Sequence, residues 1–230
     1  MIFFDLDNTL LDHDGAEQNA IEAFAASHPG ELVAGTEAIG KAWRDISDSQ
    51  RARWRAGELD FEQLRRARIS ALFQRPLTVR EADSLMAEYY ALYRQHWRLF
   101  PDVLPALEAL KAVASMAIIT NGFAYHQEAK LKQMAIRDYF QFMVISEQVG
   151  HAKPHPNIFR QALRQSGLSA EQCWYIGNHP DNDATAASQL GFKAVWLNRH
   201  YQDTPSPSVQ VNTRVVRTLG GFVELVKMNG

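Results

Sequence analysis

The sequence has little of what marks membrane-bound or disulfide-linked proteins. It contains one cysteine, Cys173, so no disulfide can form within the chain, and the apolar residues at 174–176 predict a buried packing side chain. No apolar run approaches the ~20 residues that a membrane-spanning helix needs. Asp5 and Asp7 interrupt the hydrophobic stretch at the amino terminus, which is unlike a secretory signal. We therefore expect a cytoplasmic protein without a membrane partner.

An excess of charge of one sign is also missing. The 230 residues carry a formal net charge of -2 and a pI of about 6.4, so no overall field attracts the chain to nucleic acid. Two local runs of arginine, within residues 51–55 and 65–68, are predicted to be solvated helix faces. The composition is that of an ordinary globular protein, either a monomer or a homodimer.

Hydrophobic spacing divides the chain into two parts. Residues 1–6 form a short apolar run that ends in carboxylates, as expected of a buried strand. From residue 14 to residue 98 the apolar residues recur at helical spacing, and no convincing strand interrupts them. Breaks at three places divide this region into about four helices. The breaking residues are Pro29 with Gly30, Gly57, and Pro76. We predict an all-helical cap domain at residues 14–98, inserted into a core domain of residues 1–13 and 99–230.

Strands and helices alternate after residue 99, which is typical of a parallel sheet covered by helices on both faces. The predicted fold class is therefore α/β, a Rossmann-like doubly wound parallel sheet with its first strand at the centre. The predicted strands are residues 1–6, 116–120, 140–145, 173–176 and 194–197. The predicted helices are residues 103–113, 125–134, 156–165, 181–190 and 222–226, with a surface loop at residues 202–207.

Polar residues able to do chemistry cluster at the ends of these segments. Open parallel sheets bind ligands at the carboxyl ends of their strands, where the strand order reverses. The residues that fall there are Asp5, Asp7, Thr120, Asn121, Lys153, Asn178, Asp181 and Asp183. Each short motif alone is an ordinary turn or helix cap. Their joint occurrence at strand ends predicts one site.

The residue types suit attack on a phosphate ester. A carboxylate such as Asp5 is a nucleophile without prior deprotonation, and Asp7 is placed to protonate the leaving alcohol and later to activate water. Lys153 and the Thr120 hydroxyl suit the oxygens of a phosphoryl group. The backbone N–H groups of the Asn121-Gly122 turn suit an anion at a helix start. Repulsion between the carboxylate and the phosphate requires a hard cation such as Mg²⁺.

The order of the motifs resembles the haloacid dehalogenase (HAD) superfamily over the whole chain. The resemblance is carried by Asp5-Leu6-Asp7-Asn8-Thr9, Thr120-Asn121-Gly122, Lys153-Pro154 and the acidic segment after Gly177. The helical insertion is similar to the type 1 cap of that superfamily. Residues 118–123, 137–140, 144–150 and 196–198 are most similar to its bacterial pyrimidine 5'-nucleotidase branch.

The resemblance implies a phosphatase that forms a phospho-aspartyl intermediate on Asp5 and hydrolyses pyrimidine nucleoside 5'-monophosphates. It implies that the substrate phosphate is bound by Thr120, Asn121 and Lys153. It implies Mg²⁺ or Mn²⁺ as cofactor, held by Asp5, Asp7, Asn178 and Asp183. One position departs from the family pattern, because Asn178 stands where a metal-binding aspartate is usual, and this removes one negative charge from the site.

Other functions stay open at this stage. The substrate can be another small phosphate ester, such as a sugar phosphate or phosphoglycolate, and the protein can bind a phosphate ligand without catalysis. A 2-haloacid dehalogenase shares the nucleophile but lacks the second aspartate, so Asp7 argues against that activity. No motif encodes specificity. The aromatic residues able to stack on a pyrimidine are Trp43, Trp54, Tyr89, Phe123 and Tyr125, although helix-spaced aromatic residues usually belong to a core.

Overall fold

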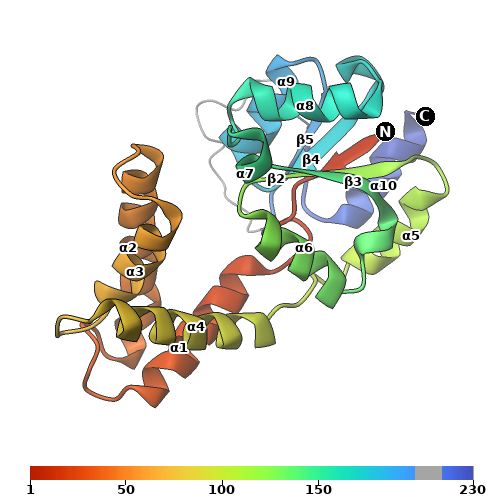
Figure 1. Ribbon diagram of the computed structural model, residues 1–230. Coiled ribbons are helices and arrows are strands. Elements are labelled where there is room, and N and C mark those ends of the chain that lie inside the picture. Colours follow the sequence, from red (N-terminus) through yellow and green to blue (C-terminus); the bar gives the residue numbers. More distant parts are fainter. Residues whose placement is uncertain (200–213, 230) are drawn as a thin grey trace. The chain divides into compact units, whose positions relative to one another are not determined.

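The computed structural model describes residues 1–199 and 214–229, and the loop predicted at residues 202–207 lies outside them. The described residues form one sheet of six parallel strands in the order β3-β2-β1-β4-β5-β6 (Figure 1). The strands are β1 (Ile2–Phe4), β2 (Met116–Thr120), β3 (Phe140–Ile145), β4 (Trp174–Gly177), β5 (Lys193–Leu197) and β6 (Arg214–Val216). The predicted doubly wound sheet is confirmed. The sequence does not predict β6, because this edge strand is short and largely exposed.

The strand order determines where a ligand site forms. The chain runs from β1 through β2 to β3 at one edge, and then returns to the other side of β1 for β4, β5 and β6. The carboxyl ends of β1 and β4 therefore flank the point where the order reverses, at which such sheets bind ligands. Phe4 pairs in register with Ile118 of β2 and with Ile176 of β4, so the residues after Phe4 lie between the ends of both neighbours.

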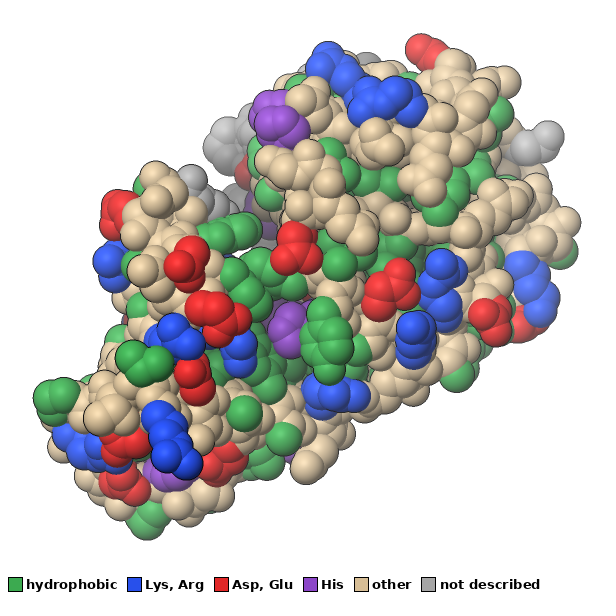
Figure 2. Space-filling model, viewed as in Figure 1, with side chains coloured by type: hydrophobic (Ala, Val, Ile, Leu, Met, Phe, Trp, Pro, Cys, Tyr) green, Lys and Arg blue, Asp and Glu red, His purple; other side chains and the backbone are tan. Residues whose placement is uncertain are grey.

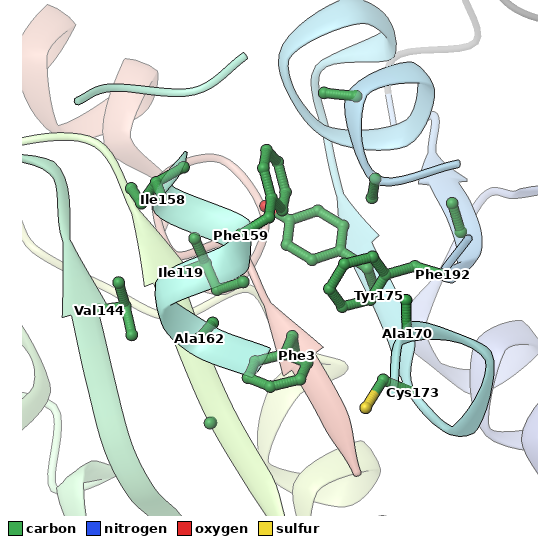
Figure 3. Packing of buried hydrophobic residues seen from close by; sticks show 14 residues of the cluster. Phe3, Ile119, Val144, Ile158, Phe159, Ala162, Ala170, Cys173, Tyr175 and Phe192 are labelled. Carbon is green, nitrogen blue, oxygen red and sulfur yellow. The ribbon is translucent and has the colours of Figure 1, made fainter. Parts of the chain in front are cut away.

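Helices cover both faces of the sheet (Figure 1). On one face, Phe159 of α8 (Pro156–Ser166) meets Tyr175 of β4 edge to face, within a buried cluster that also contains Phe3 of β1 (Figure 3). Cys173 belongs to the same cluster and is fully buried, as predicted. Burying one large apolar side chain contributes about 1.5–3 kcal/mol, so this cluster is a main source of the stability of the sheet.

The opposite face is covered by α5 (Val103–Lys111) and α10 (Leu219–Met228). Phe222 of α10 meets Phe4 and Trp174 edge to face, with ring centroids 6.0 and 5.9 Å apart. The other helices that follow β2 along the chain are α6 (Ala124–Gln133), α7 (Ser146–Val149) and α9 (Ala186–Gln189). Short 3-10 turns lie at Arg137–Tyr139 and Ala170–Gln172. Among the helices in residues 1–199 and 214–229, none combines the length and the hydropathy of a membrane-spanning segment.

One predicted helix is wrong in its geometry. Instead of a regular helix over residues 181–190, the chain forms a π-helical turn at Pro180–Thr185, followed by the short helix α9. The backbone N–H groups of Asp183 and Ala184 both donate to the carbonyl oxygen of His179, at 3.0 and 3.4 Å, which widens the turn. Such wide turns are frequent at functional sites.

The chain divides into two compact units, Met1–Asp12 with Arg98–Gly230, and His13–Trp97. The second unit holds four helices: α1 (His13–Ser27), α2 (Thr36–Arg55), α3 (Phe61–Ser70) and α4 (Val79–Gln95). Residues 13–97 are all described and contain no strand longer than an isolated bridge between Leu32 and Phe73, so this unit is helical as the spacing predicts. In its core the Trp43 indole N–H donates to the Tyr89 hydroxyl at 2.9 Å, and both side chains are buried.

The arginine runs of the helical unit differ from the predicted solvated faces, because Arg53 is exposed whereas Arg51, Arg65 and Arg66 are half-buried. Four of these arginines form ion pairs with acidic neighbours: Arg51 with Asp48, Arg53 with Glu58, Arg65 with Glu62 and Arg66 with Asp83. Figure 2 shows side chains of both signs interspersed on the face in view. The prediction is wrong for Arg68, which is buried with its guanidinium group 4.6 Å from the centroid of the Trp43 ring and bonded to the Ser47 hydroxyl.

Candidate active site at the end of the central strand

Asp5 directly follows β1 and is buried at the point where the strand order reverses. Its backbone N–H donates to the carbonyl oxygen of Ile176 in β4 at 2.9 Å. Its Oδ2 accepts a hydrogen bond from Thr9 Oγ1 and its Oδ1 accepts one from Lys153 Nζ, both at 2.7 Å. Thr9 can reach back because Asn8 adopts a left-handed backbone conformation, with φ 60°, which asparagine tolerates better than most residues. The carboxylate therefore has a defined orientation.

Lys153 connects Asp5 to a second buried carboxylate. Its Nζ lies 2.6 Å from Asp183 Oδ1 and 3.0 Å from the Tyr175 hydroxyl, in addition to its contact with Asp5. The Tyr175 hydroxyl donates to the same Asp183 oxygen at 2.7 Å. All of these groups lie within the buried core of the site. One positive charge thus serves two negative charges, and the cluster keeps an excess of negative charge that a cation can neutralise.

Burial of this cluster changes the acidity of its members. Burial, opposed by Lys153 and reinforced by the nearby charge of Asp183, raises the pKa of Asp5 from 3.8 to about 6. Burial lowers the pKa of Lys153, but Asp183 and Asp5 more than offset this effect and raise the pKa above its ordinary value. Lys153 therefore remains positively charged. Asp5 is a carboxylate whose negative charge is only partly compensated by protein groups.

Asp183 is held by the wide turn after β4. Its Oδ2 accepts a hydrogen bond from the backbone N–H of His179 at 2.9 Å, while its Oδ1 faces Lys153. The carboxyl group packs so closely on Gly177 that a Cβ atom at that position would lie 2.4 Å from Asp183 Cγ. Only glycine allows this approach. Both oxygens of Asp183 are thus engaged by the protein, and its observed contacts are those of a group that orients Lys153.

The Asp7 carboxylate points toward α6. Its oxygens lie 2.7 and 2.8 Å from Lys130 Nζ, and Oδ2 also accepts a hydrogen bond from Gln127 Nε2 at 3.1 Å. Gln127 Nε2 in addition donates to Thr120 Oγ1 at 2.6 Å. Asp7 and Thr120 are therefore connected through one buried amide.

Asn121 connects the end of β2 to the loop that carries Lys153. Its side chain donates from Nδ2 to the backbone oxygen of Lys153 at 3.0 Å and accepts from the backbone N–H of Lys153 at 2.7 Å. The Asn121 amide group thus positions the lysine backbone, and a contact of Asn121 with phosphate stays a prediction.

At the expected anion site before α6, the Gly122 N–H is bonded within the protein, and contact of an anion with the Asn121 N–H stays a prediction. The backbone N–H of Gly122 donates to Ser146 Oγ at 2.9 Å, and the N–H of Ala124 donates to Glu147 Oε2 at 2.8 Å. A carboxylate of the protein itself therefore occupies the helix start. The sequence does not reveal this contact, because Glu147 is separated from α6 by an entire strand.

Asn178 follows β4 and faces Asp5. Its backbone N–H donates to Thr9 Oγ1 at 3.0 Å, and the Trp196 indole donates to its backbone oxygen at 2.9 Å. One terminal atom of its side-chain amide lies 3.3 Å from Asp5 Oδ2 and 3.2 Å from the backbone oxygen of Asp7. With nitrogen at that position, the amide donates to both oxygens. With oxygen there, three oxygens converge, which is the donor set that a hard cation prefers.

This donor set tests whether a metal ion fits the site. Among residues 1–199 and 214–229, no three side chains of histidine, cysteine, aspartate or glutamate are grouped to hold a metal. The convergence at Asp5 instead uses one carboxylate, one backbone carbonyl and one amide. Such a set of neutral and anionic oxygens suits Mg²⁺, which is commonly bound by few carboxylates and completes its shell with water and substrate.

Several residues that contact the site have no role predicted for them from the sequence. They are Thr9, Gln127, Lys130, Tyr175, Glu147 and Trp196. Thr9 belongs to the first motif and is the one that the sequence could have indicated. Gln127 and Lys130 are three residues apart on one helix face, a polar pair on a face that periodicity assigns to the interior. Tyr175 lies inside an apolar strand, where a tyrosine normally signals packing.

The site thus consists of a buried aspartate after the central strand of a doubly wound sheet, paired with a lysine from a later loop. This arrangement is that of an α/β enzyme whose active site is built around a carboxylate. Residues 1–191 match the family model of the haloacid dehalogenase-like hydrolases. The chain belongs to this family of hydrolases, and the resemblance seen in the sequence is confirmed.

Individual relatives show how the chain compares with known proteins. It is 30% identical to pyrimidine 5'-nucleotidase YjjG of Escherichia coli, over 89% of this chain and 88% of the relative. It is 27% identical to a glyceraldehyde 3-phosphate phosphatase of Methanothermobacter thermautotrophicus, over 97% of this chain and 96% of the relative. The putative HAD-hydrolase YfnB of Bacillus subtilis, in a crystal form bound to magnesium, superposes with a TM-score of 0.80 at 20% identity, over 98% of this chain and 97% of that one. The last similarity shows a shared fold.

Proposed function

We propose that this hydrolase is a Mg²⁺-dependent phosphatase that cleaves small phosphate monoesters through a phospho-aspartyl intermediate on Asp5. The observation that carries the proposal is the buried Asp5 carboxylate at the strand switch point, with Lys153 on one oxygen and Thr9 on the other. A carboxylate placed beside a fixed ammonium group can attack phosphorus while the ammonium group stabilises the phosphoryl oxygens.

The chemistry proceeds in two displacements at phosphorus. First, an oxygen of Asp5 attacks phosphorus, the bond to the leaving oxygen breaks with its electron pair, and Asp7 gives its proton to that oxygen. Then Asp7 takes a proton from water, the water oxygen attacks phosphorus, and the bond to Asp5 breaks to release phosphate. Lys153 and the Thr120 hydroxyl stabilise the negative charge that develops on the phosphoryl oxygens.

The proposed metal ligands are the Asp5 carboxylate, the backbone oxygen of Asp7 and the Asn178 amide oxygen. Mg²⁺ held by these groups would supply positive charge that offsets the repulsion of Asp5 and the phosphate. Mn²⁺ is the alternative ion. This set modifies the sequence prediction at two positions, because the Asp7 carboxylate contacts Lys130 and the Asp183 carboxylate contacts Lys153. We propose that Asp183 orients Lys153.

For the substrate, we propose a pyrimidine nucleoside 5'-monophosphate. The 30% identity to a pyrimidine 5'-nucleotidase over most of both chains supports this choice. Among the aromatic candidates, Trp43 and Tyr89 are buried at 1% exposure, whereas Tyr125 is 71% exposed in the first turn of α6, three residues after Gly122. Tyr125 is the one described aromatic side chain among the exposed large apolar residues, and a nucleobase is a suitable partner for it.

A sugar phosphate is the second candidate. The observation in its favour is the 27% identity to a glyceraldehyde 3-phosphate phosphatase over nearly the full length of both chains. The two candidates differ in what the tyrosine does. Stacking on a base is worth ~1–3 kcal/mol, so Tyr125→Ala should raise the KM for a pyrimidine nucleotide by roughly tenfold and leave that for a sugar phosphate unchanged.

Two measurements test the proposal. Enzyme quenched in acid during turnover of a phosphate ester should carry phosphate on Asp5 by mass spectrometry. Asp5→Asn should lose both the adduct and turnover, because an amide does not attack phosphorus, whereas Asp7→Asn should slow turnover by ~10²–10⁴ and still form the adduct. Turnover that persists in Asp5→Asn would place the chemistry elsewhere.

A substrate panel then separates the candidate functions. The panel contains pyrimidine and purine nucleoside monophosphates, sugar phosphates, phosphoglycolate and 2-chloropropionate, each assayed with Mg²⁺ and with Mn²⁺. Preference for the pyrimidine nucleotides supports the proposal, and preference for a sugar phosphate supports the second candidate. Halide release would indicate a dehalogenase, against which Asp7 argues. Binding of phosphate without any turnover would indicate a binding protein.

A further inference from the structure

Helix α6 carries a buried polar pair that the catalytic motifs do not include. Gln127 is 1% exposed and Lys130 is 4% exposed. The two residues are three positions apart and therefore project from the same face of the helix. Lysine is almost never fully buried unless its charge is paired. The burial of both side chains indicates that α6 directs them to a specific partner.

That partner is the Asp7 carboxylate. Lys130 Nζ lies 2.7 Å from Oδ1 and 2.8 Å from Oδ2, and Gln127 Nε2 lies 3.1 Å from Oδ2. The same Gln127 nitrogen lies 2.6 Å from Thr120 Oγ1 and 3.2 Å from the backbone oxygen of Asn121. The amide therefore spans the residue proposed for proton transfer and the strand end proposed to bind phosphate.

We propose that Gln127 and Lys130 are positioning residues for proton transfer by Asp7. This inference rests on the proposed phosphatase function. Proton transfer requires the carboxyl oxygen to lie within about 2.6–3.2 Å of the leaving oxygen, directly or through one water. Lys130 contacts both oxygens and restricts rotation of the carboxylate, and Gln127 sets its distance from the Thr120 hydroxyl. Neither residue belongs to the nucleophile or the proposed metal ligands.

The inference predicts that the loss of Lys130 affects only the step that needs a proton. An alkyl phosphate has a strongly basic leaving oxygen that must be protonated as the bond breaks, whereas the p-nitrophenolate of p-nitrophenyl phosphate leaves without a proton. Single-turnover experiments with enzyme in excess measure this first bond-breaking step and exclude the later hydrolysis of the intermediate. The two esters therefore separate positioning of Asp7 from a general disturbance of the site.

The variants are Lys130→Met, which removes the charge, and Lys130→Arg, which keeps it, with Lys132→Met as the control on the exposed side of α6. We expect Lys130→Met to slow release of the alkyl alcohol by ~10²-fold and release of p-nitrophenol by no more than a few-fold. Lys130→Arg should restore part of the alkyl rate, and Lys132→Met should match the unmodified enzyme. Gln127→Met should also slow release of the alkyl alcohol more than release of p-nitrophenol, but by a smaller factor than Lys130→Met. The Mg²⁺-induced rise in melting temperature should persist in every variant.

Equal loss for both esters, or no loss for either, would overturn the inference. If Lys130→Met does not fold, the Lys130→Arg and Gln127→Met variants decide the question by the same ratio of rates. Failure of the proposed function is distinguishable, because the unmodified enzyme would then form no adduct on Asp5. An adduct on Asp5 in the unmodified enzyme, together with equal effects on both esters, removes only the role of α6.

Discussion

Asp5 illustrates how a single buried charge ties catalysis to stability. Its carboxylate shares Lys153 with Asp183, so the protein neutralises only part of the negative charge that it buries. Burial, together with the nearby charge of Asp183, raises the pKa of Asp5 from 3.8 to about 6. A cation is expected to correct this imbalance of charge, which would make the empty protein less stable than the loaded one.

The first prediction concerns the pH dependence of stability in EDTA. Because the pKa of Asp5 is raised in the folded protein, the contribution of its carboxyl group to the free energy of unfolding is most favourable below about pH 4. This contribution is lost as the pH rises through about 6. Asp5→Asn keeps the site neutral, so it should be more stable than the unmodified protein at pH 8, by up to roughly 3 kcal/mol. This advantage should shrink as the pH falls through 6. Urea denaturation at pH 8, 6 and 4.5 measures it.

The control for this experiment is Asp45→Asn, which neutralises an exposed carboxylate of α2 that pairs with Lys41. It should show no comparable gain at pH 8. In saturating Mg²⁺ the unmodified protein should be more stable than Asp5→Asn at pH 8, because only the carboxylate attracts the cation. An Asp5→Asn protein that is less stable than the unmodified one at pH 8 in EDTA would contradict the argument.

Asn178 provides the second prediction. Its side-chain amide lies 3.3 Å from Asp5 Oδ2, so Asn178→Asp adds a negative charge beside an existing one. In EDTA the variant should melt at a lower temperature, and added Mg²⁺ should raise its melting temperature more than that of the unmodified protein. The Mg²⁺ concentration for half-maximal activity should also fall. Asn182→Asp, which adds the same charge within the π-helical turn, is the control. If Asn178→Asp and the unmodified protein give identical Mg²⁺ titrations, Asn178 is not a ligand of the metal site.

At the scale of elements, β4 and the π-helical turn after it act as one support for Lys153. β4 contributes the Tyr175 hydroxyl and ends at Gly177, and the turn brings Asp183 back onto that glycine. A regular helix would not let two successive N–H groups bond to the carbonyl of His179. The geometry of the turn thus decides which way Asp183 faces.

The third prediction tests this support. Gly177→Ala would place a Cβ atom 2.4 Å from Asp183 Cγ, so the turn must shift. We expect a loss of roughly 1–3 kcal/mol in the free energy of unfolding and a fall in turnover of at least ~10-fold, as expected when reacting groups are misplaced. Gly220→Ala is the matched control, because its nearest heavy atom is Thr218 Oγ1 at 3.7 Å. Equal behaviour of the two variants in urea would show that the close approach has no energetic weight.

At the scale of the whole molecule, the chain consists of two compact units, each with a core of its own. The helical unit is built around Trp43 and Tyr89, and the sheet around β1 and its neighbours. Units with separate cores commonly unfold in separate transitions. All proposed metal ligands belong to the sheet unit.

The fourth prediction follows from this division. Scanning calorimetry should show two transitions, and Mg²⁺ with orthophosphate should raise only the one that belongs to the sheet unit. At a hundredfold excess over Kd the stabilisation is about 2.7 kcal/mol. Asp5→Asn should abolish most of this shift while leaving the other transition in place. An equal shift of both transitions would show that the helical unit also contributes to ligand binding.

Local patterns determine a large part of this protein. Helical spacing predicts the all-helical region, because burial of one helix face imposes a period on the sequence. The apolar run at residues 1–6 predicts β1, and the alternation after residue 99 predicts four of the five strands described there. That Asp5 and Thr120 follow or end neighbouring strands at one edge of the sheet is also predictable, because parallel strands end at the same edge. β6 escapes prediction, since this three-residue edge strand is largely exposed and has no buried apolar run to mark it.

Tertiary structure alone decides how the charges are paired. Lys130 is 123 positions from Asp7, and Lys153 is 148 positions from Asp5, so no local spacing links either pair. The same holds for Glu147, which accepts a hydrogen bond from the backbone N–H of Ala124 at the start of α6. Periodicity reports which face of an element is buried. It does not report which buried polar groups meet, because that depends on the packing of elements distant in the chain.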